Sequence, residues 1–235
     1  MSKTKKAAPS QGNDILESPE ALAQQLSKTE DFLEKNRNTV FFIGGVIGIL
    51  LMAFFGYKYY IDNQDQVAQR ELFQAVYYFE ADSLGKALNG DGLNYGFLDV
   101  ISEYGGTKAA NLANFYAGAT YLQLEDYESA LRYLEDFGGD DLILQARAYS
   151  LIGDANAELK DYGSAAEYYE KAATQMPNEQ FSPVYWQKAA VAYEKLNQTD
   201  KALNAYNQIV NKYFESTLFQ DAKKHKARLE MKSKS

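Results

Sequence analysis

The side chains of this chain that come closest to a chemical site are one histidine and a cluster of carboxylates, because the sequence contains no cysteine. His225 stands among lysines without a spaced carboxylate partner, so we expect a surface or packing residue. The carboxylates, which could attract a divalent cation, are Glu135, Asp136, Asp140 and Asp141. They lack the alternating ligands and the distal Glu of an EF-hand loop. We therefore expect a helix end followed by an Asp N-cap, and no metal site.

Other chemical patterns are absent from the sequence. Residues 89–92 (NGDG) predict a turn, since neither a Walker loop nor a Rossmann pattern surrounds them. No combination of nucleophile, base and oxyanion donors can be traced along the chain. We therefore predict a protein that is not an enzyme, that has no cofactor and that binds no small-molecule substrate.

Charge is distributed unevenly along the chain. Residues 59–211 carry 10 Lys and Arg against 23 Asp and Glu, whereas residues 212–235 carry 7 against 3. An acidic body repels phosphates, which argues against a nucleic-acid partner. The basic tail is typical of a solvated helix end, although it could also contact anionic lipid or an acidic partner.

Residues 40–57 form an uncharged apolar run, VFFIGGVIGILLMAFFGY, between Arg37 and Lys58. The interval between these charges spans about 30 Å as a helix, which matches the hydrocarbon core of a bilayer. The run ends in bulky aromatic residues, whereas a cleavable signal peptide ends in small residues. We predict a transmembrane helix over residues 39–60, in which Gly44 and Gly48 have the spacing of a helix-packing face.

Residues 1–38 are predicted to form a polar head that is partly disordered and contains a short amphipathic helix starting near Ser18 and Pro19. Six Lys and Arg precede the apolar run and two follow it within twenty residues. The positive-inside rule then places the head in the cytoplasm. For a bacterial inner membrane, the C-terminal domain of this single-pass protein would lie in the periplasm.

The remainder of the chain contains three similar blocks, with spacings of 35 and 37 residues. Their ranges are 117–137, 152–172 and 189–209. Gly118, Gly153 and Ala190 occupy one position of the pattern, and an alanine follows twelve residues later each time. This pattern resembles the tetratricopeptide repeat, a pair of antiparallel helices. The resemblance implies three such repeats over residues 111–216, stacked as an α-solenoid.

The two ends of the array are predicted to depart from the repeat. Residues 61–110 read as a degenerate leading repeat with an irregular insertion at 82–91, and residues 217–235 as a capping helix and basic tail. The apolar residues expected in the leading core are Val67, Phe73, Val76, Phe79, Leu93, Phe97 and Val100. The predicted fold class is all-α: one transmembrane helix followed by a solenoid of about nine helices.

Repeat solenoids bind peptides along the inner curve, which is lined by the first helix of each pair. Carried over from the repeat pattern, that surface has twelve predicted residues. They are Leu112, Phe115, Ala119, Leu122, Arg147, Ser150, Asp154, Glu158, Val184, Gln187, Val191 and Glu194. Apolar residues in the outer repeats flank an acidic centre, so we expect a partner segment with hydrophobic and basic residues.

The layout of head, apolar span and acidic repeats resembles the YfgM family, ancillary subunits of the bacterial Sec translocon. The segment that carries the likeness is DFLEKNRNTVFFIGGVIGILLMAFFGYKYY, residues 31–60, with the repeats that follow it. The resemblance implies two protein partners, the SecYEG translocon and a membrane-anchored prolyl isomerase chaperone. The repeat domain would then help to handle newly translocated proteins in the periplasm.

Two other classes of protein remain open. An inner-membrane scaffold for cell-envelope assembly or division would share the anchor and the repeats. An import receptor of an organelle outer membrane would instead hold the repeats in the cytosol and bind targeting peptides.

Overall fold

The computed structural model describes the chain except for residues 1–22, 24–26, 28, 31, 140 and 233–235. The predicted head, including the start of its amphipathic helix, lies largely outside the described residues. The part that is described consists of α-helices and their connections, with no strand, so the fold class is all-α. The chain divides into two compact units, Met1–Tyr59 and Tyr60–Ser235.

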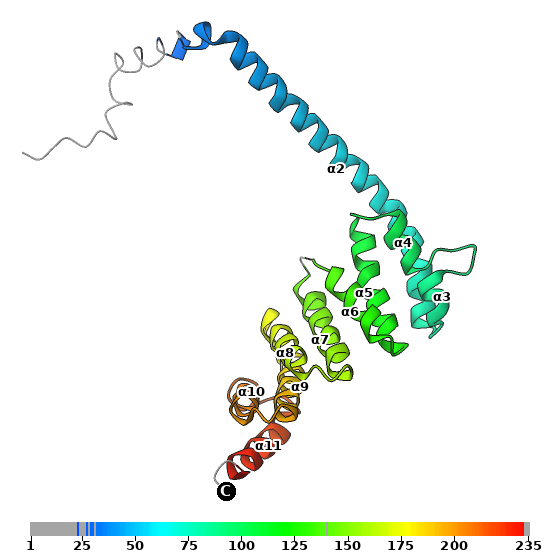
Figure 1. Ribbon diagram of the computed structural model, residues 1–235, viewed down its shortest axis with the longest axis vertical. Helices are drawn as coiled ribbons and strands as arrows, with labels where there is room; N and C mark the ends of the chain where they lie inside the picture. Colours follow the sequence, from blue (N-terminus) through cyan, green and yellow to red (C-terminus); the bar gives the residue numbers. More distant parts are fainter. Residues whose placement is uncertain (1–22, 24–26, 28, 31, 140, 233–235) are drawn as a thin grey trace, which may run out of the picture. The chain divides into compact units, whose positions relative to one another are not determined.

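The first helix to be described in full, α2, runs without a break over Arg37–Glu80 (Figure 1). The apolar run and the first helix of the leading repeat, predicted as separate elements, therefore belong to one helix. Residues 57–80 contain neither Gly nor Pro, so nothing in this sequence interrupts the helix. Among the described helices, α2 alone is long and apolar enough to cross a membrane, and its apolar window is not buried inside the protein.

The part of α2 that belongs to the second unit buries Ala68, Leu72 and Ala75. Phe73, which we expected in the core, is 73% exposed. The prediction for this residue is wrong because the three buried residues define one face of the helix, and Phe73 lies about 100° from Leu72 around the axis. The other three residues predicted on this helix are half-buried, and the ring of Phe79 packs edge-on against Tyr116.

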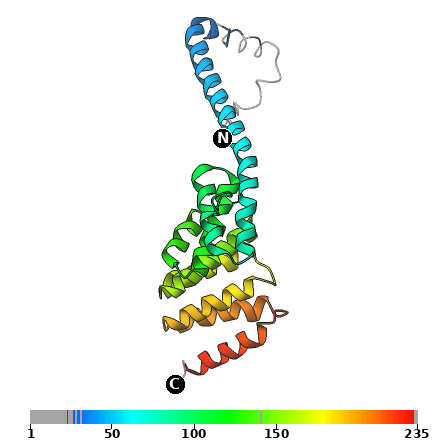
Figure 2. The same cartoon turned by 90° about the vertical axis from the view of Figure 1, so that its right-hand side faces the viewer.

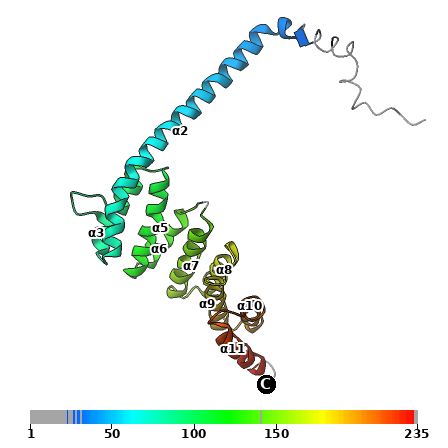
Figure 3. The same cartoon turned by 180° about the vertical axis from the view of Figure 1, so that it is seen from behind.

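The second helix of the leading repeat is divided in two, α3 (Leu84–Asn89) and α4 (Phe97–Glu103). The stretch predicted as an irregular insertion therefore contains a helix, and the unit has ten helices among its described residues rather than nine. A loop of residues 90–96 separates α3 from α4 and projects beside α3 in Figure 3. Leu93, predicted in the core, is 93% exposed in this loop, whereas Phe97 and Val100 are fully buried.

The base of this loop requires glycine. Gly90 has a φ of +72°, in the left-handed region. A Cβ at Gly96 would overlap the backbone of Leu88 and Gly90. Between them the Asp91 carboxylate accepts hydrogen bonds from the Tyr78 hydroxyl (2.7 Å) and from the backbone of the loop, which lower the pKa of Asp91 well below its usual value.

Seven further helices follow one another as a stack, and Figure 2 shows the last of them, yellow to red, as successive layers. They are α5 (Lys108–Gln123), α6 (Tyr127–Asp136), α7 (Leu142–Glu158), α8 (Tyr162–Gln175), α9 (Ser182–Lys195), α10 (Thr199–Lys212) and α11 (Phe219–Lys232). Asp141 accepts the amides of Ile143 and Leu144 at the start of α7. The prediction that this part of the acidic cluster is an N-cap is thus confirmed.

The turn within each helix pair has the same backbone geometry. Glu125, Lys160 and Asn197 have φ values of +62°, +65° and +57° at the helix C-termini. The amide of the residue that follows each of them bonds back to a carbonyl five residues earlier, at 3.0, 2.9 and 2.9 Å. This closure of the helix end recurs with the repeat spacing and fixes where each second helix begins.

Candidate functional site

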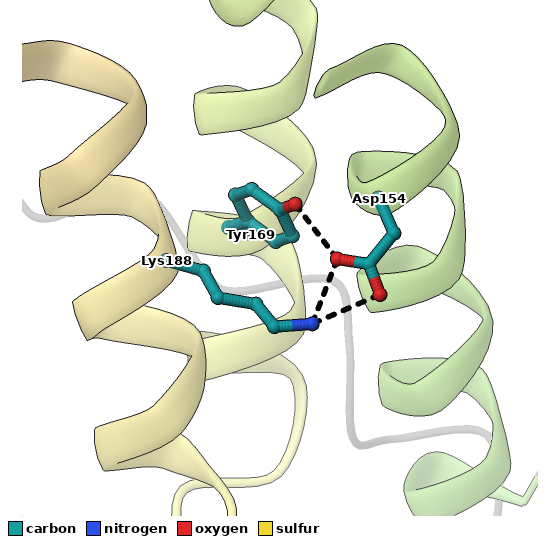
Figure 4. Close-up of polar contacts among 3 residues, drawn as sticks. All are labelled: Asp154, Tyr169 and Lys188. Carbon is teal, nitrogen blue, oxygen red and sulfur yellow. Dashed lines mark hydrogen bonds and ion pairs between the residues drawn. The ribbon is translucent and has the colours of Figure 1, made fainter. Parts of the chain in front are cut away.

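The first feature of the candidate site is a polar cluster formed by three helices (Figure 4). Asp154 lies on α7, Tyr169 on α8 and Lys188 on α9. The Tyr169 hydroxyl donates to Asp154 Oδ1 at 2.7 Å, and Lys188 Nζ donates to Oδ1 and Oδ2 of the same carboxylate at 2.7 and 2.9 Å. Lys188 Nζ also lies 5.4 Å from the centre of the Tyr169 ring. The cluster therefore joins one helix pair to the first helix of the next.

Close packing of small residues positions these side chains. A Cβ on Gly153 would lie 2.6 Å from Cε1 of Tyr169, so only glycine lets α8 place this ring against α7. One block earlier, a Cβ on Gly118 would lie 2.5 Å from Cγ of Leu134. In both blocks the large side chain stands sixteen residues after the glycine. The small residues of the sequence pattern thus leave the space in which a large side chain of the second helix packs.

A second cluster of the same kind lies between α9, α10 and α11. The Tyr206 hydroxyl donates to Glu194 Oε1 at 2.8 Å, and Arg228 bonds to the other carboxylate oxygen. In both clusters the cation stands 34 residues after the carboxylate. The ring of His225 stacks on Tyr206 with centroids 5.4 Å apart. His225 is therefore a packing residue of the capping helix, which is one of the two roles that the sequence predicted for it.

Burial and neighbouring carboxylates keep these tyrosines protonated. Burial, and then the Asp154 carboxylate, raises the pKa of Tyr169 far above its ordinary value. Burial, followed by hydrogen bonding to Glu194, does the same for Tyr206. Each hydroxyl is therefore a neutral donor across the physiological range, which a fixed hydrogen bond to a carboxylate requires.

Beside the first cluster lies an open, mainly apolar groove of about 350 Å³, which we call the α7–α9 groove. It is lined by Ala157, Tyr162, Tyr169, Val184, Gln187, Lys188, Val191, Ala192 and Lys195. Val184 and Val191 are 39% and 46% exposed, and they stand about two turns apart on α9, so both present apolar surface on the same face of the helix. The groove offers apolar contact with a few polar groups, which is typical of a binding site.

The twelve residues predicted on the inner curve do not form one surface. Phe115, Ala119 and Ser150 are buried and cannot contact a partner. Those that are half-buried are Leu112, Leu122, Asp154, Gln187 and Glu194, and those that are exposed are Arg147, Glu158, Val184 and Val191. Three of the twelve, Val184, Gln187 and Val191, line the α7–α9 groove. Leu112 lies in a separate open groove of about 720 Å³ near the start of α5.

Sequence reasoning missed six of the nine groove residues. Two of them come from a second helix, which was not counted as part of the surface, and four lie on first helices at positions that the repeat pattern did not select. Tyr162 and Tyr169 come from the second helix, α8. Lys188 and Lys195 lie on α9, but their importance depends on which charges they meet across the groove. The seven-residue spacing of Lys188 and Lys195, which matches that of Val184 and Val191, was the available signal.

One carboxylate of the expected acidic centre, Asp154, is neutralised in the structure, whereas Glu158 is exposed and forms no ion pair within 4 Å among the described residues. Asp154 is paired with Lys188, and Glu194 is paired with Arg228. The sequence analysis did not include either cation in the charge of this surface, because each stands 34 residues from its carboxylate in the sequence. The reasoning that led to a basic partner segment is therefore wrong at Asp154, and it is not contradicted at Glu158.

Two further predicted features can be placed. Apart from their chain neighbours and the nearby backbone of their own helix, Gly44 and Gly48 have no described atoms within 4 Å of the position of a Cβ, so their role as a packing face stays a prediction. Within the part of the chain that the structure describes, no three His, Asp or Glu side chains are grouped to hold a metal ion.

Comparison with protein families bears on the helices that form the groove. Residues 146–178 and 186–216 each match a tetratricopeptide repeat model. The chain carries tetratricopeptide repeats. The first matched segment covers most of α7 and all of α8, and the second covers most of α9 and all of α10. Tetratricopeptide repeats are protein–protein interaction modules, and the α7–α9 groove lies where two of them meet. No curated protein matches the chain.

Proposed function

We propose that this protein is a single-pass membrane protein whose repeat unit captures an apolar segment of another polypeptide in the α7–α9 groove. The observation that carries the proposal is the pair of exposed valines, Val184 and Val191, in an apolar groove between two matched repeats. A solenoid presents such grooves to extended or helical peptides.

The proposed anchor is the first part of α2. Its apolar side chains are exposed, among them Phe42 at 73% and Met52 at 70%. An uncovered apolar stretch of this length is favourable in lipid and unfavourable in water. The excess of Lys and Arg before the span supports a cytoplasmic N-terminus and a periplasmic repeat unit.

The more specific proposal is an ancillary subunit of the Sec translocon that helps periplasmic handling of secreted proteins. It is supported by the resemblance of residues 31–60 and of the repeat layout to the YfgM family. Its partners would be SecYEG and a membrane-anchored prolyl isomerase chaperone.

The test is co-purification of the full chain from gently solubilised membranes, with Val191→Asp as the groove variant. Leu142→Asp is the matched control, because Leu142 is an exposed apolar residue that does not line the groove. We expect Val191→Asp to reduce partner capture and Leu142→Asp to leave it unchanged. Equal capture by both variants would refute the groove as the binding site.

The proteins recovered, together with topology, test the finer proposal. SecY and an isomerase support it, whereas envelope assembly factors would replace it with a scaffold. A reporter fused after Ser235 that reads as cytosolic would exclude the proposed orientation and would favour an import receptor.

A further inference from the structure

The charges in the α7–α9 groove indicate which kind of polypeptide segment it can accept. The residues that line the groove include two cations, Lys188 and Lys195, and no carboxylate. Asp154 lies at its edge, with Oδ1 bonded to Tyr169 and both oxygens bonded to Lys188. A basic side chain entering the groove would have to displace Lys188 from this carboxylate.

Displacement of Lys188 is unfavourable. Its ammonium group is held by both oxygens of Asp154 and lies over the Tyr169 ring. The lysine and aspartate side chains are 34% and 27% exposed, so the pair is only partly screened by water. An incoming cation would replace one ion pair with another and leave a half-buried ammonium without its partner.

The second cation, Lys195, has no such partner. It is exposed in the last turn of α9, and it makes no ion pair within 4 Å among the residues described. Its neighbour in the chain, Glu194, is bonded to Tyr206 and Arg228.

Glu158 is an exposed carboxylate on the facing helix, α7, that does not line the groove. Its charge helps to raise the pKa of Tyr127 on α6, where burial is the larger cause, and that of Tyr169 on α8, where burial and Asp154 are the larger causes. Among the residues that line the groove, the charge left without an ion pair is therefore the positive charge of Lys195.

We propose that the α7–α9 groove selects an apolar segment that carries an acidic side chain, with the apolar residues against Val184 and Val191 and the carboxylate at Lys195. This inference rests on the proposed function and adds the chemistry of the partner segment. It reverses the basic partner that the sequence alone suggested.

The test uses two fluorescent peptides with one apolar core, flanked by Glu in one and by Lys in the other. Binding to the full chain in non-ionic detergent is measured by fluorescence anisotropy. One exposed ion pair changes affinity by about two- to fivefold, so we expect the Glu-flanked peptide to bind about two- to fivefold more tightly. Higher salt should reduce this preference, since Lys195 is exposed.

Two variants locate the effect. Lys195→Glu should reverse the preference, whereas Lys212→Glu, the same charge change at an exposed residue outside the groove, should preserve it. Equal or tighter binding of the Lys-flanked peptide to the unaltered protein would overturn the inference and leave the groove as a peptide site. So would a preference that Lys195→Glu does not alter. If neither peptide binds, or if Val191→Asp binds both as well as the unaltered protein does, the proposed function fails as well.

Discussion

Gly153→Ala should destabilise the repeat unit because α7 and α8 leave no room for one methyl group. The added Cβ would lie 2.6 Å from Cε1 and 2.7 Å from Cδ1 of Tyr169. The ring is buried, and its hydroxyl is tied to Asp154 at 2.7 Å, so it cannot turn aside without losing that bond. Overpacking costs about 1–3 kcal/mol, and this constraint favours the upper end. Alanine returns about 1 kcal/mol through helix propensity, so we expect a net loss of about 2 kcal/mol.

The measurement is thermal unfolding of the full chain in non-ionic detergent, followed by far-ultraviolet circular dichroism. A loss of about 2 kcal/mol corresponds to a fall in Tm of about 4–8 °C for a unit of this size. Gly85→Ala is the matched control, because Gly85 lies in α3 and has nothing within 4 Å of its Cβ position. We expect that substitution to leave the Tm unchanged or to raise it slightly.

The reasoning would be refuted by a Gly153→Ala protein that melts at or above the temperature of the unaltered chain. That result would mean that Tyr169 can move away at no cost. An equal fall for Gly85→Ala would also count against it, since the effect would then come from the substitution and not from the contact.

Three further predictions concern a turn, a buried hydroxyl and alkaline pH. Lys160→Gly should raise the Tm by about 2–4 °C, because it relieves a left-handed φ of +65° that costs about 1 kcal/mol; an unchanged or lower Tm contradicts this. Tyr206→Phe should lower the free energy of unfolding by about 1–2 kcal/mol, because a fully buried hydroxyl that donates to Glu194 is lost. An unchanged thermal unfolding curve would count against that hydrogen bond. Burial, and then Glu170, raises the pKa of Tyr193 from 10.0 to about 12, so the folded chain keeps a proton that the unfolded chain releases. This contribution to stability is complete below pH about 10 and is lost towards pH 12, and a Tm that stays constant from pH 9 to pH 12 would disprove it.

Local and periodic features were readable from the sequence because they depend on residues close together in the chain. Small residues such as Gly118 and Gly153 recur with the repeat, and only close packing of two helices requires them at that spacing. Asp141 could be predicted as a helix cap because a cap depends on the amides two and three residues ahead. The apolar run of α2 was equally evident from composition.

The tertiary structure alone decided which charges and surfaces remain available. Lys188 neutralises Asp154 from 34 residues away, and the strength of that pairing depends on the distance between α7 and α9. Phe73 and Leu93 are apolar in the sequence but exposed in the fold, because Phe73 lies off the buried face of α2 and Leu93 lies in the loop between α3 and α4. Burial and ion pairing are sums over neighbours brought together by folding, so a pattern along one chain segment cannot supply them.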